Sequence, residues 1–175
     1  MLTGPEIARQ IRRGAISITP YDPARLNPNS YNVRLGERLL RYAPGTLSTK
    51  RPPVIEEEIT IPETGYILRK GVGYLGHTVE VTRSEAFVPK IDGRSSTGRL
   101  FLIVHCTAGF GDDGFWGQWT LEIVPLAYDV EVFPGDELLQ VSFEPTIGQR
   151  NPYRGRYQGQ SGPVASRLPR PNKET

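Results

Sequence analysis

The chain has 175 residues and a formal net charge of +2 at pH 7. Hydrophobic residues make up 37% of it and charged residues 23%, which is typical of a soluble globular protein with one main domain and a core of its own. The single cysteine excludes an internal disulfide and suits a reducing compartment, so we expect a cytoplasmic protein.

Neither a membrane nor a nucleic acid is expected as a partner. No apolar run approaches the roughly 20 residues that span a bilayer, and the first residues lack the layout of a signal peptide. Nucleic-acid-binding proteins usually carry a basic stripe or a platform of stacking aromatics, and neither is evident here. Arginines scattered among glycines and hydroxyl side chains suit a small polyanion better than a duplex.

The N-terminal residues are predicted to form one helix. Thr3 and Glu6 have the spacing of a capping box, in which each side chain binds a free backbone N–H of the first turn. Ile7 and Ile11 share one face, and Gly14 is a natural stop.

The remainder of the first 145 residues alternates short apolar segments with loops. Residues 18–30 and 43–53 are rich in Pro, Gly, Asn and Ser and are predicted to be loops. Strands are predicted at residues 31–35, 37–42, 58–61, 65–70, 74–81, 86–91, 102–104, 119–124, 130–133 and 138–144. Many short strands with a single helix predict an all-β sandwich or jelly-roll barrel and disfavour a doubly wound α/β fold.

A change in composition divides the chain near Thr146. From there the residues are mostly Gly, Pro, Arg, Gln, Ser and Asn, with few apolar anchors. We therefore expect residues 1–145 to form the β-barrel domain with its N-terminal helix, and residues 146–175 to form an extended C-terminal tail.

The segment 93–124 concentrates the reactive side chains. At its start, residues 93–99 place arginines and hydroxyls between glycines, where backbone amides and guanidinium groups can bind phosphate oxygens. An ordinary polar turn explains the same residues, and the two alternatives stay open.

His105 and Cys106 do not indicate a metal site. The only other histidine is His77 and there is no second cysteine, so the ligand set of the zinc nucleobase deaminases is missing. On a strand, adjacent side chains point to opposite faces, which also disfavours a Cys–His nucleophile. Packing or orienting roles are expected for both residues.

Two acidic positions have open interpretations. Asp112 and Asp113 lie in a glycine-dense loop with Phe115, where aspartate is either a turn former or a ligand for a sugar hydroxyl or a water. Glu122 lies within a predicted strand. It either faces solvent or lines a pocket, where burial would raise its pKa and make it a proton shuttle.

Taken together, the motifs resemble one family. GRSS at residues 93–96, Arg99, HCTAG at 105–109, the loop around Asp112 and TLEI at 120–123 resemble the dCTP deaminase branch of the dUTPase-like superfamily. The resemblance extends to SYNVRLG at residues 30–36, to Pro134 and Gly135, and to the tail segment 157–167. These motifs cover most of the chain in the family's order.

The resemblance implies a distorted jelly-roll, dUTPase-like β-barrel that forms a homotrimer with active sites at the subunit interfaces. It implies zinc-independent hydrolysis of dCTP to dUTP and ammonia in pyrimidine deoxynucleotide metabolism. Mg²⁺ would be held through the triphosphate and not by a protein metal site. Two alternatives remain: a dUTP diphosphatase or bifunctional enzyme that gives dUMP and pyrophosphate, and a non-catalytic nucleotide-binding regulator.

The resemblance also implies catalytic roles. Glu122 matches the carboxylate that takes a proton from the attacking water and passes it to the pyrimidine and the leaving amine. Ser95 and Arg99 match polar groups that support this water, the base and the phosphates. Ala108 matches a small residue whose backbone positions the water, and Asp112 matches an acid near the deoxyribose.

Substrate binding is implied for a second set of residues. Phe115 would place its ring under the sugar. Tyr153, Arg156 and Gln160 would close over the triphosphate and base. The set is completed by Arg94, Ser96 and Thr107. Three positions depart from the family's common pattern: Asn32 stands where Asp is frequent, Gly111 replaces a branched residue, and Arg156 replaces a common Lys.

Overall fold

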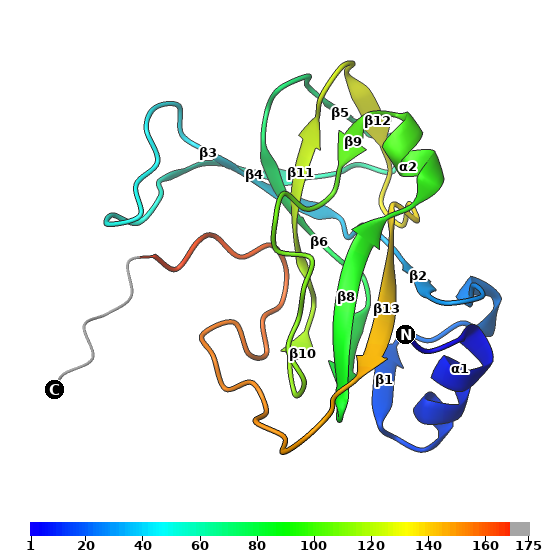
Figure 1. Ribbon diagram of the computed structural model, residues 1–175. Coiled ribbons are helices and arrows are strands. Elements are labelled where there is room, and N and C mark those ends of the chain that lie inside the picture. Colours follow the sequence, from blue (N-terminus) through cyan, green and yellow to red (C-terminus); the bar gives the residue numbers. More distant parts are fainter. Residues whose placement is uncertain (169–175) are drawn as a thin grey trace, which may run out of the picture.

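The computed structural model describes residues 1–168, and most of its secondary structure is strand (Figure 1). The predicted all-β class is confirmed, with a jelly-roll-like barrel and short helices. The end of the predicted tail, residues 169–175, lies outside the described residues. No helix within residues 1–168 is long and apolar enough to cross a membrane.

The N-terminal helix forms where the sequence predicts it. α1 (Gly4–Arg12) begins after Thr3, whose Oγ1 accepts a hydrogen bond from the Glu6 N–H at 3.4 Å. Ile7 is fully buried against the barrel, and Gly14 ends the turn with a φ of +76°. Figure 1 shows the helix lying beside β1 (Ile16–Thr19) at one end of the barrel.

The strands pair antiparallel throughout and form four small sheets. The largest is five-stranded, in the order β4 (Ile55–Thr60), β3 (Arg38–Tyr42), β6 (Tyr74–His77), β11 (Thr120–Pro125) and β9 (Leu102–Ile103). The two three-stranded sheets are β1, β7 (Val81–Ser84), β10 (Trp116–Gly117) and β2 (Tyr31–Val33), β13 (Leu139–Pro145), β8 (Phe87–Gly93). The smallest pairs β12 (Val130–Val132) with β5 (Tyr66–Leu68).

Several elements differ from the sequence-based expectation. β1, β10 and α2 (Ser95–Arg99) were not predicted as elements. The expected strand at residues 74–81 ends at His77 as β6, because the chain turns at Thr78, whose Oγ1 donates to the Glu80 carbonyl at 2.8 Å. β7 begins at Val81 and continues over residues 82–84, which were not predicted as a strand. His105 and Cys106 follow β9 in a bend, so the expectation that they are strand neighbours is wrong.

Alternate side chains of β11 are buried in the core, which leaves the other face of this strand outside the core. Leu121 and Ile123 are fully buried in the barrel interior, while Thr120, Glu122 and Val124 alternate with them and are partly exposed. Because successive side chains on a strand point to opposite faces, burial of the two apolar residues directs Glu122 away from the core.

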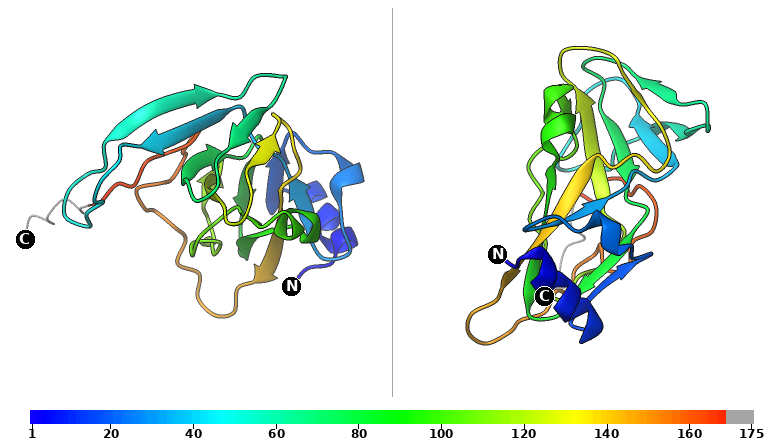
Figure 2. Two further views of the ribbon diagram at one scale, coloured as in Figure 1. Left: turned by 90° about the horizontal axis from the view of Figure 1, so that it is seen from above. Right: turned by 90° about the vertical axis from the view of Figure 1, so that its right-hand side faces the viewer.

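Two extended segments lie beside this outer face. The β3–β4 hairpin reaches away from the barrel, and the chain that follows β13 returns towards the same side (Figures 1 and 2). The two segments meet where the Ser166 backbone N–H donates to the Tyr42 hydroxyl at 2.8 Å. The tail, the base of the hairpin and β11 therefore surround a common space.

Candidate functional site

A cavity of about 480 Å³ lies against the outer face of β11. It is bordered by the loop between β9 and β10 and by the tail that follows β13. Of the residues expected to act in catalysis or binding, the following line it: Ala108, Asp112, Phe115, Glu122, Tyr153 and Gln160. The structure thus brings together side chains from three separate segments of the chain.

Glu122 lies on the wall of this cavity. One carboxylate oxygen, Oε2, accepts the Cys106 backbone N–H at 3.1 Å, which fixes its orientation. Burial raises the pKa of the Cys106 thiol, and the neighbouring negative charge of Glu122 adds to that effect. Burial likewise raises the pKa of the Tyr42 hydroxyl, which also lines the cavity, with smaller contributions from Tyr157 and Glu122. Both groups therefore stay protonated and neutral beside the carboxylate.

Aromatic rings form the apolar part of the wall. Phe115 is buried and packs against Trp119 and Tyr153, with ring centroids at 5.2 and 5.9 Å. Asp112 lies at the exposed edge of the same loop and borders the cavity. A flat apolar surface beside a carboxylate is suited to a ring that carries hydroxyl groups, such as a furanose.

Backbone hydrogen bonds hold the tail over the cavity. The Gly159 N–H donates to the Trp116 carbonyl at 2.8 Å, and the Gln118 N–H donates to the Gln160 carbonyl at 3.0 Å. Gly117 makes this approach possible, because its φ is +147° and a Cβ there would lie 2.9 Å from the Gln160 carbonyl oxygen. The side-chain amide of Gln160 donates to the Gln118 carbonyl at 2.7 Å, so it stabilises the closed tail.

Other expected site residues lie elsewhere in the single chain. Ser95, Ser96 and Arg99 are exposed on α2, and Arg99 borders a second hollow of about 410 Å³ together with Phe101 and Tyr128. Thr107 is exposed in the loop after β9. A single chain therefore does not unite Arg99 with Glu122.

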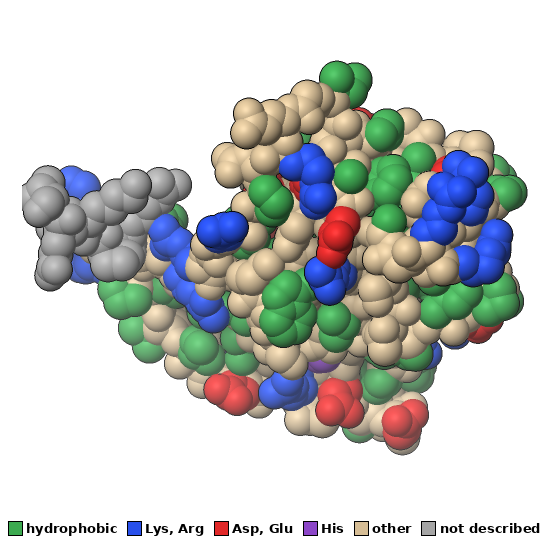
Figure 3. Space-filling model, turned by 90° about the horizontal axis from the view of Figure 1, so that it is seen from below, with side chains coloured by type: hydrophobic (Ala, Val, Ile, Leu, Met, Phe, Trp, Pro, Cys, Tyr) green, Lys and Arg blue, Asp and Glu red, His purple; other side chains and the backbone are tan. Residues whose placement is uncertain are grey.

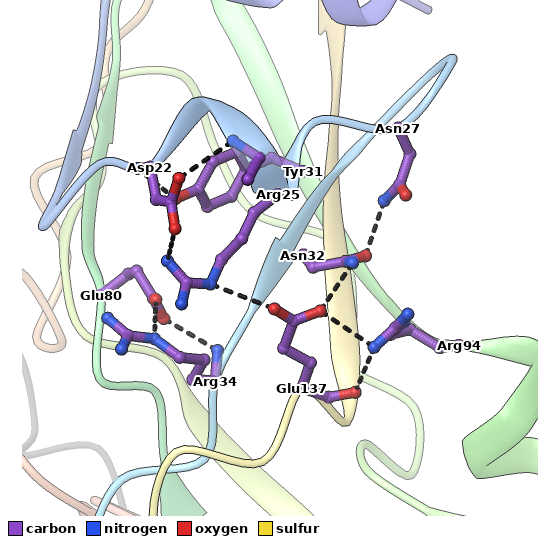
Figure 4. Close-up of polar contacts among 10 residues, drawn as sticks. Asp22, Arg25, Asn27, Tyr31, Asn32, Arg34, Glu80, Arg94 and Glu137 are labelled. Carbon is purple, nitrogen blue, oxygen red and sulfur yellow. Dashed lines mark hydrogen bonds and ion pairs between the residues drawn. The ribbon is translucent and has the colours of Figure 1, made fainter.

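Arg94 and Arg156 have partners within the chain. The Arg156 Nη1 donates to the Arg167 carbonyl. The Arg94 guanidinium binds Glu137, whose Oε2 lies 3.0 Å from Nη1 and whose backbone carbonyl oxygen lies 2.9 Å from the same atom. Figure 4 shows that Glu137 occupies the centre of a polar network at this point.

The network around Glu137 gives Asn32 a structural role. The Asn32 side-chain amide donates to Glu137 Oε2 at 2.8 Å, and Arg25 Nε binds Oε1 at 3.1 Å (Figure 4). An aspartate at position 32 would place a second carboxylate against Glu137. Asparagine at position 32, in place of the family's frequent aspartate, is therefore compatible with the carboxylate of Glu137.

The cavity offers little to hold a bare metal ion. Among residues 1–168 there is no group of three or more His, Cys, Asp or Glu side chains placed to bind one. The cavity wall has two carboxylates, Asp112 and Glu122. His105 lies beside Asp92, with Nε2 at 3.5 Å from Oδ1.

On the face drawn in Figure 3, basic and acidic side chains are interspersed among hydrophobic and polar ones.

Sequence reasoning missed several residues that build this site. Tyr42, Tyr157 and Ser166 also line the cavity, and Gln118 accepts the Gly162 N–H on its Oε1 at 2.6 Å. Their partners are distant in the sequence, so no local pattern marks them. The tail motif at residues 157–167 was the one signal that pointed to this region.

Comparison with known proteins assigns the family. A family model described as dCTP deaminase-like matches residues 1–146. The chain is 46% identical over 163 residues to a protein of Cytophaga hutchinsonii named "dCTP deaminase, dUMP-forming", covering 93% of this chain and 92% of the relative. A protein of the same name from Hathewaya histolytica is 43% identical over 169 residues, covering 96% of each chain.

A solved structure supports the fold. The chain superposes on the 2′-deoxycytidine 5′-triphosphate deaminase of Agrobacterium tumefaciens with a TM-score of 0.68 and 20% sequence identity. The match covers 83% of this chain and 48% of that protein, so this chain spans about half of its length.

The relatives correct one expectation and establish the family. The prediction that the reaction ends at dUTP is wrong, because these relatives are named as dUMP-forming. Enzymes that stop at dUTP and enzymes that continue to dUMP both replace the pyrimidine amine with oxygen. Motifs for that deamination therefore do not specify whether the triphosphate is then cleaved. The chain belongs to the dCTP deaminase-like family of enzymes.

Proposed function

We propose that this protein is a bifunctional dCTP deaminase that forms dUMP. Two water molecules are consumed for each dCTP, and the products are dUMP, ammonia and pyrophosphate. The observation that carries this proposal is the Glu122 carboxylate on the cavity wall, oriented by the Cys106 N–H and faced by the loop of Asp112. The names of the curated relatives support the identity of the product.

The first step replaces the amine of the pyrimidine. Glu122 takes a proton from a water that attacks C4, and a new C–O bond forms. The carboxylic acid passes that proton to N3 of the ring. The carboxylate then moves the hydroxyl proton of the intermediate to the departing nitrogen, the C4–N bond breaks, the C4 carbonyl forms and ammonia leaves. The Cys106 N–H keeps the carboxylate in one orientation, and the backbone at Ala108 is suited to hold the water.

The second step cleaves the triphosphate of the bound dUTP. A second water attacks the α-phosphorus, the bond to the bridging α–β oxygen breaks, and pyrophosphate leaves with the bonding electrons. Asp112 at the cavity edge is proposed to orient this water and the deoxyribose, and the proton passes to solvent through its carboxylate. Mg²⁺, if bound with the triphosphate, would supply positive charge next to the phosphate oxygens.

The aromatic wall and the tail are proposed to bind the substrate. Phe115 supports the sugar, and Tyr153 and Gln160 cover the base and the triphosphate. Arg156 and Thr107 are proposed to contact the phosphates from the edge of the site. In the free chain Arg156 donates to a backbone carbonyl, which a phosphate oxygen can replace.

The complete site is proposed to form between copies of the chain in a homotrimer. Arg94, Ser95, Ser96 and Arg99 lie apart from Glu122 in one chain, so they are proposed to serve a neighbouring copy's cavity. Leu100, Phe101 and Tyr128 next to them are more than half exposed. Such an apolar surface beside charged residues suits a subunit interface.

The products of the reaction test the proposed function. Purified protein is incubated with dCTP and Mg²⁺, and dUTP, dUMP, ammonia and pyrophosphate are quantified over time. We expect dUMP and ammonia in equal amounts. Accumulation of dUTP without dUMP would contradict the second step. If no ammonia is released from dCTP, incubation with dUTP separates a dUTP diphosphatase, which forms dUMP, from a regulator, which does not.

Glu122→Gln tests the assigned proton shuttle. Without a carboxylate, ammonia release should fall by roughly 10²-fold or more, because general acid–base catalysis contributes at least that much. Binding of dCTP, measured as thermal stabilisation, should persist. Glu144→Gln is the control, since Glu144 is exposed on β13 away from the cavity. Ammonia release that survives Glu122→Gln would overturn the assignment.

A further inference from the structure

An ion pair joins the cavity loop to the start of the tail. The Asp113 carboxylate is 7% exposed, and it receives both arms of the Arg150 guanidinium, Nε at 2.7 Å and Nη2 at 2.8 Å. This two-pronged geometry is the strong form of an arginine–carboxylate contact. Asp113 follows Asp112 directly but is not among the residues that line the cavity. The proposed chemistry gives it no role.

Asp113 also connects two other parts of the molecule. Its Oδ1 accepts the Ala86 N–H at 2.8 Å, in the turn between β7 and β8. Its backbone carbonyl accepts the Tyr153 N–H at 2.7 Å. One residue therefore holds together a barrel turn, the cavity loop and the residue at which the tail begins to cover the cavity.

The segment between β13 and Tyr153 has few other attachments. The Thr146 N–H donates to the Ala86 carbonyl at 3.1 Å, and Ile147 beside it is 99% exposed. Within residues 147–152 of the described chain, Arg150 alone makes side-chain hydrogen bonds. Among the described residues, the ion pair is therefore the side-chain polar contact that ties residues 147–152 to the rest of the chain.

The ion pair lies close to the part of the tail that covers the cavity. Tyr153, three residues after Arg150, packs its ring on Phe115 at 5.9 Å. Gly114, next to Asp113, has a φ of +86°, and a Cβ there would lie 2.8 Å from Pro152. The loop and the tail segment are therefore in direct contact beside the ion pair.

We propose that the Asp113–Arg150 ion pair is a latch that positions the tail over the nucleotide cavity. Both residues are positioning residues, because they act on substrate through Tyr153 and the tail segment 153–166. The expected effect on dCTP rests on the proposed function, whereas the position of the tail does not. Opening the latch lowers the fraction of molecules with a closed tail, and apparent affinity falls with that fraction.

Arg150→Gln removes the charged fork and leaves the Asp113–Ala86 bond in place. Hydrogen exchange of the nucleotide-free protein should show faster exchange in residues 153–166 and unchanged exchange in β8 and β13. For dCTP we expect KM to rise about tenfold with kcat changed less than about twofold, as for a loss of binding and not of chemistry. Arg150→Lys keeps the charge without the fork and should give an intermediate result.

Two further variants separate the latch from a general loss of stability. Arg9→Gln removes an exposed ion pair with Glu6 in α1 and should leave tail exchange and KM unchanged. Asp113→Asn combined with Arg150→Gln should be no worse for KM than the more severe single variant, because both changes break the same contact.

The outcomes are distinguishable from failure of the proposed function. If Arg150→Gln lowers Tm but leaves tail exchange unchanged, the ion pair is merely structural and the latch is disproved. If the parent protein releases no ammonia from dCTP, the proposed function fails. Exchange in the nucleotide-free protein still decides whether Arg150 holds the tail.

Discussion

At the scale of single residues, His77 shows how burial fixes a protonation state. The ring is 6% exposed, with Nδ1 donating to the Thr78 carbonyl at 2.9 Å and Nε2 accepting the Arg38 N–H at 3.4 Å. Both bonds form together only in a neutral ring with its proton on Nδ1. Glycine at position 36 leaves room for the His77 ring, because a Cβ at that position would lie 2.1 Å from the ring.

This arrangement predicts an acid-dependent loss of stability. Burial lowers the pKa of His77 in the folded protein, so at acidic pH the unfolded chain binds a proton that the folded chain does not. The stability that this ring contributes is therefore complete above the ordinary histidine pKa of about 6.5 and is lost as pH falls through the lowered value. Urea unfolding at a series of pH values measures it.

Substitution of each histidine assigns the effect. His77→Gln should reduce the fall in unfolding free energy below about pH 6.5, although the variant is less stable at neutral pH. His105→Gln removes the other histidine and should retain the fall. An unchanged pH profile in His77→Gln would show that other groups cause it.

The sequence predicted residue types better than residue partners. Thr3 and Glu6 are found in the predicted cap because both groups of that contact lie within one turn. Arg94 pairs with Glu137, which is far along the chain in the β12–β13 connection and could not be predicted as its partner, and the expected role of Arg94 in phosphate binding stays a prediction. Glu122 had two open interpretations, and only the three-dimensional position of the tail decides that its face borders a cavity.

At the scale of elements, short or polar segments were the hardest to predict. β10 has only two residues, too few for a period-two pattern. β1 does alternate, with Ile16 and Ile18 buried and Ser17 and Thr19 exposed, but its second half was assigned to the proline-marked loop that was predicted from residue 18. α2 contains no large apolar residue, and its buried Thr97 is held by a hydrogen bond from Oγ1 to the Leu138 carbonyl at 2.8 Å. Tertiary contacts, and not local propensity, stabilise that helix.

The tail is the element whose removal should separate binding from folding. Its contacts reach the barrel through backbone bonds at Trp116 and Gln118 and through the packing of Tyr153 on Phe115, whereas the buried core ends at Phe143. We expect a chain that ends at residue 146 to unfold cooperatively with a modestly lower Tm. Its stabilisation by dCTP should be largely lost.

Thermal unfolding with and without nucleotide measures both properties. A ligand at about 100 times its Kd stabilises a folded protein by about 2.7 kcal/mol, so a loss of binding is easily detected. The control is the full chain under the same conditions. A shortened chain that fails to unfold cooperatively, or that is still stabilised by dCTP to the same extent, would contradict this division of roles.

At the scale of the whole molecule, the two groups of expected site residues lie on different surfaces. Glu122 and Asp112 border the cavity under the tail, and Arg99 borders the hollow at α2 beside Phe101 and Tyr128. In a cyclic oligomer every copy presents both surfaces, and each interface joins one surface of a copy to the other surface of its neighbour. A shared site is therefore possible only if Arg99 of one copy faces Glu122 of another.

Subunit mixing tests this arrangement. Arg99→Ala and Glu122→Gln are each expected to be inactive alone, since every site then lacks one group. When the two variants are unfolded together and refolded as an equal mixture, each site draws its two groups from different copies at random. About one quarter of the sites then combine an intact Arg99 with an intact Glu122, so ammonia release should return to about one quarter of the parent rate. If both groups of a site belonged to one copy, every site would carry one defect and the mixture would stay inactive.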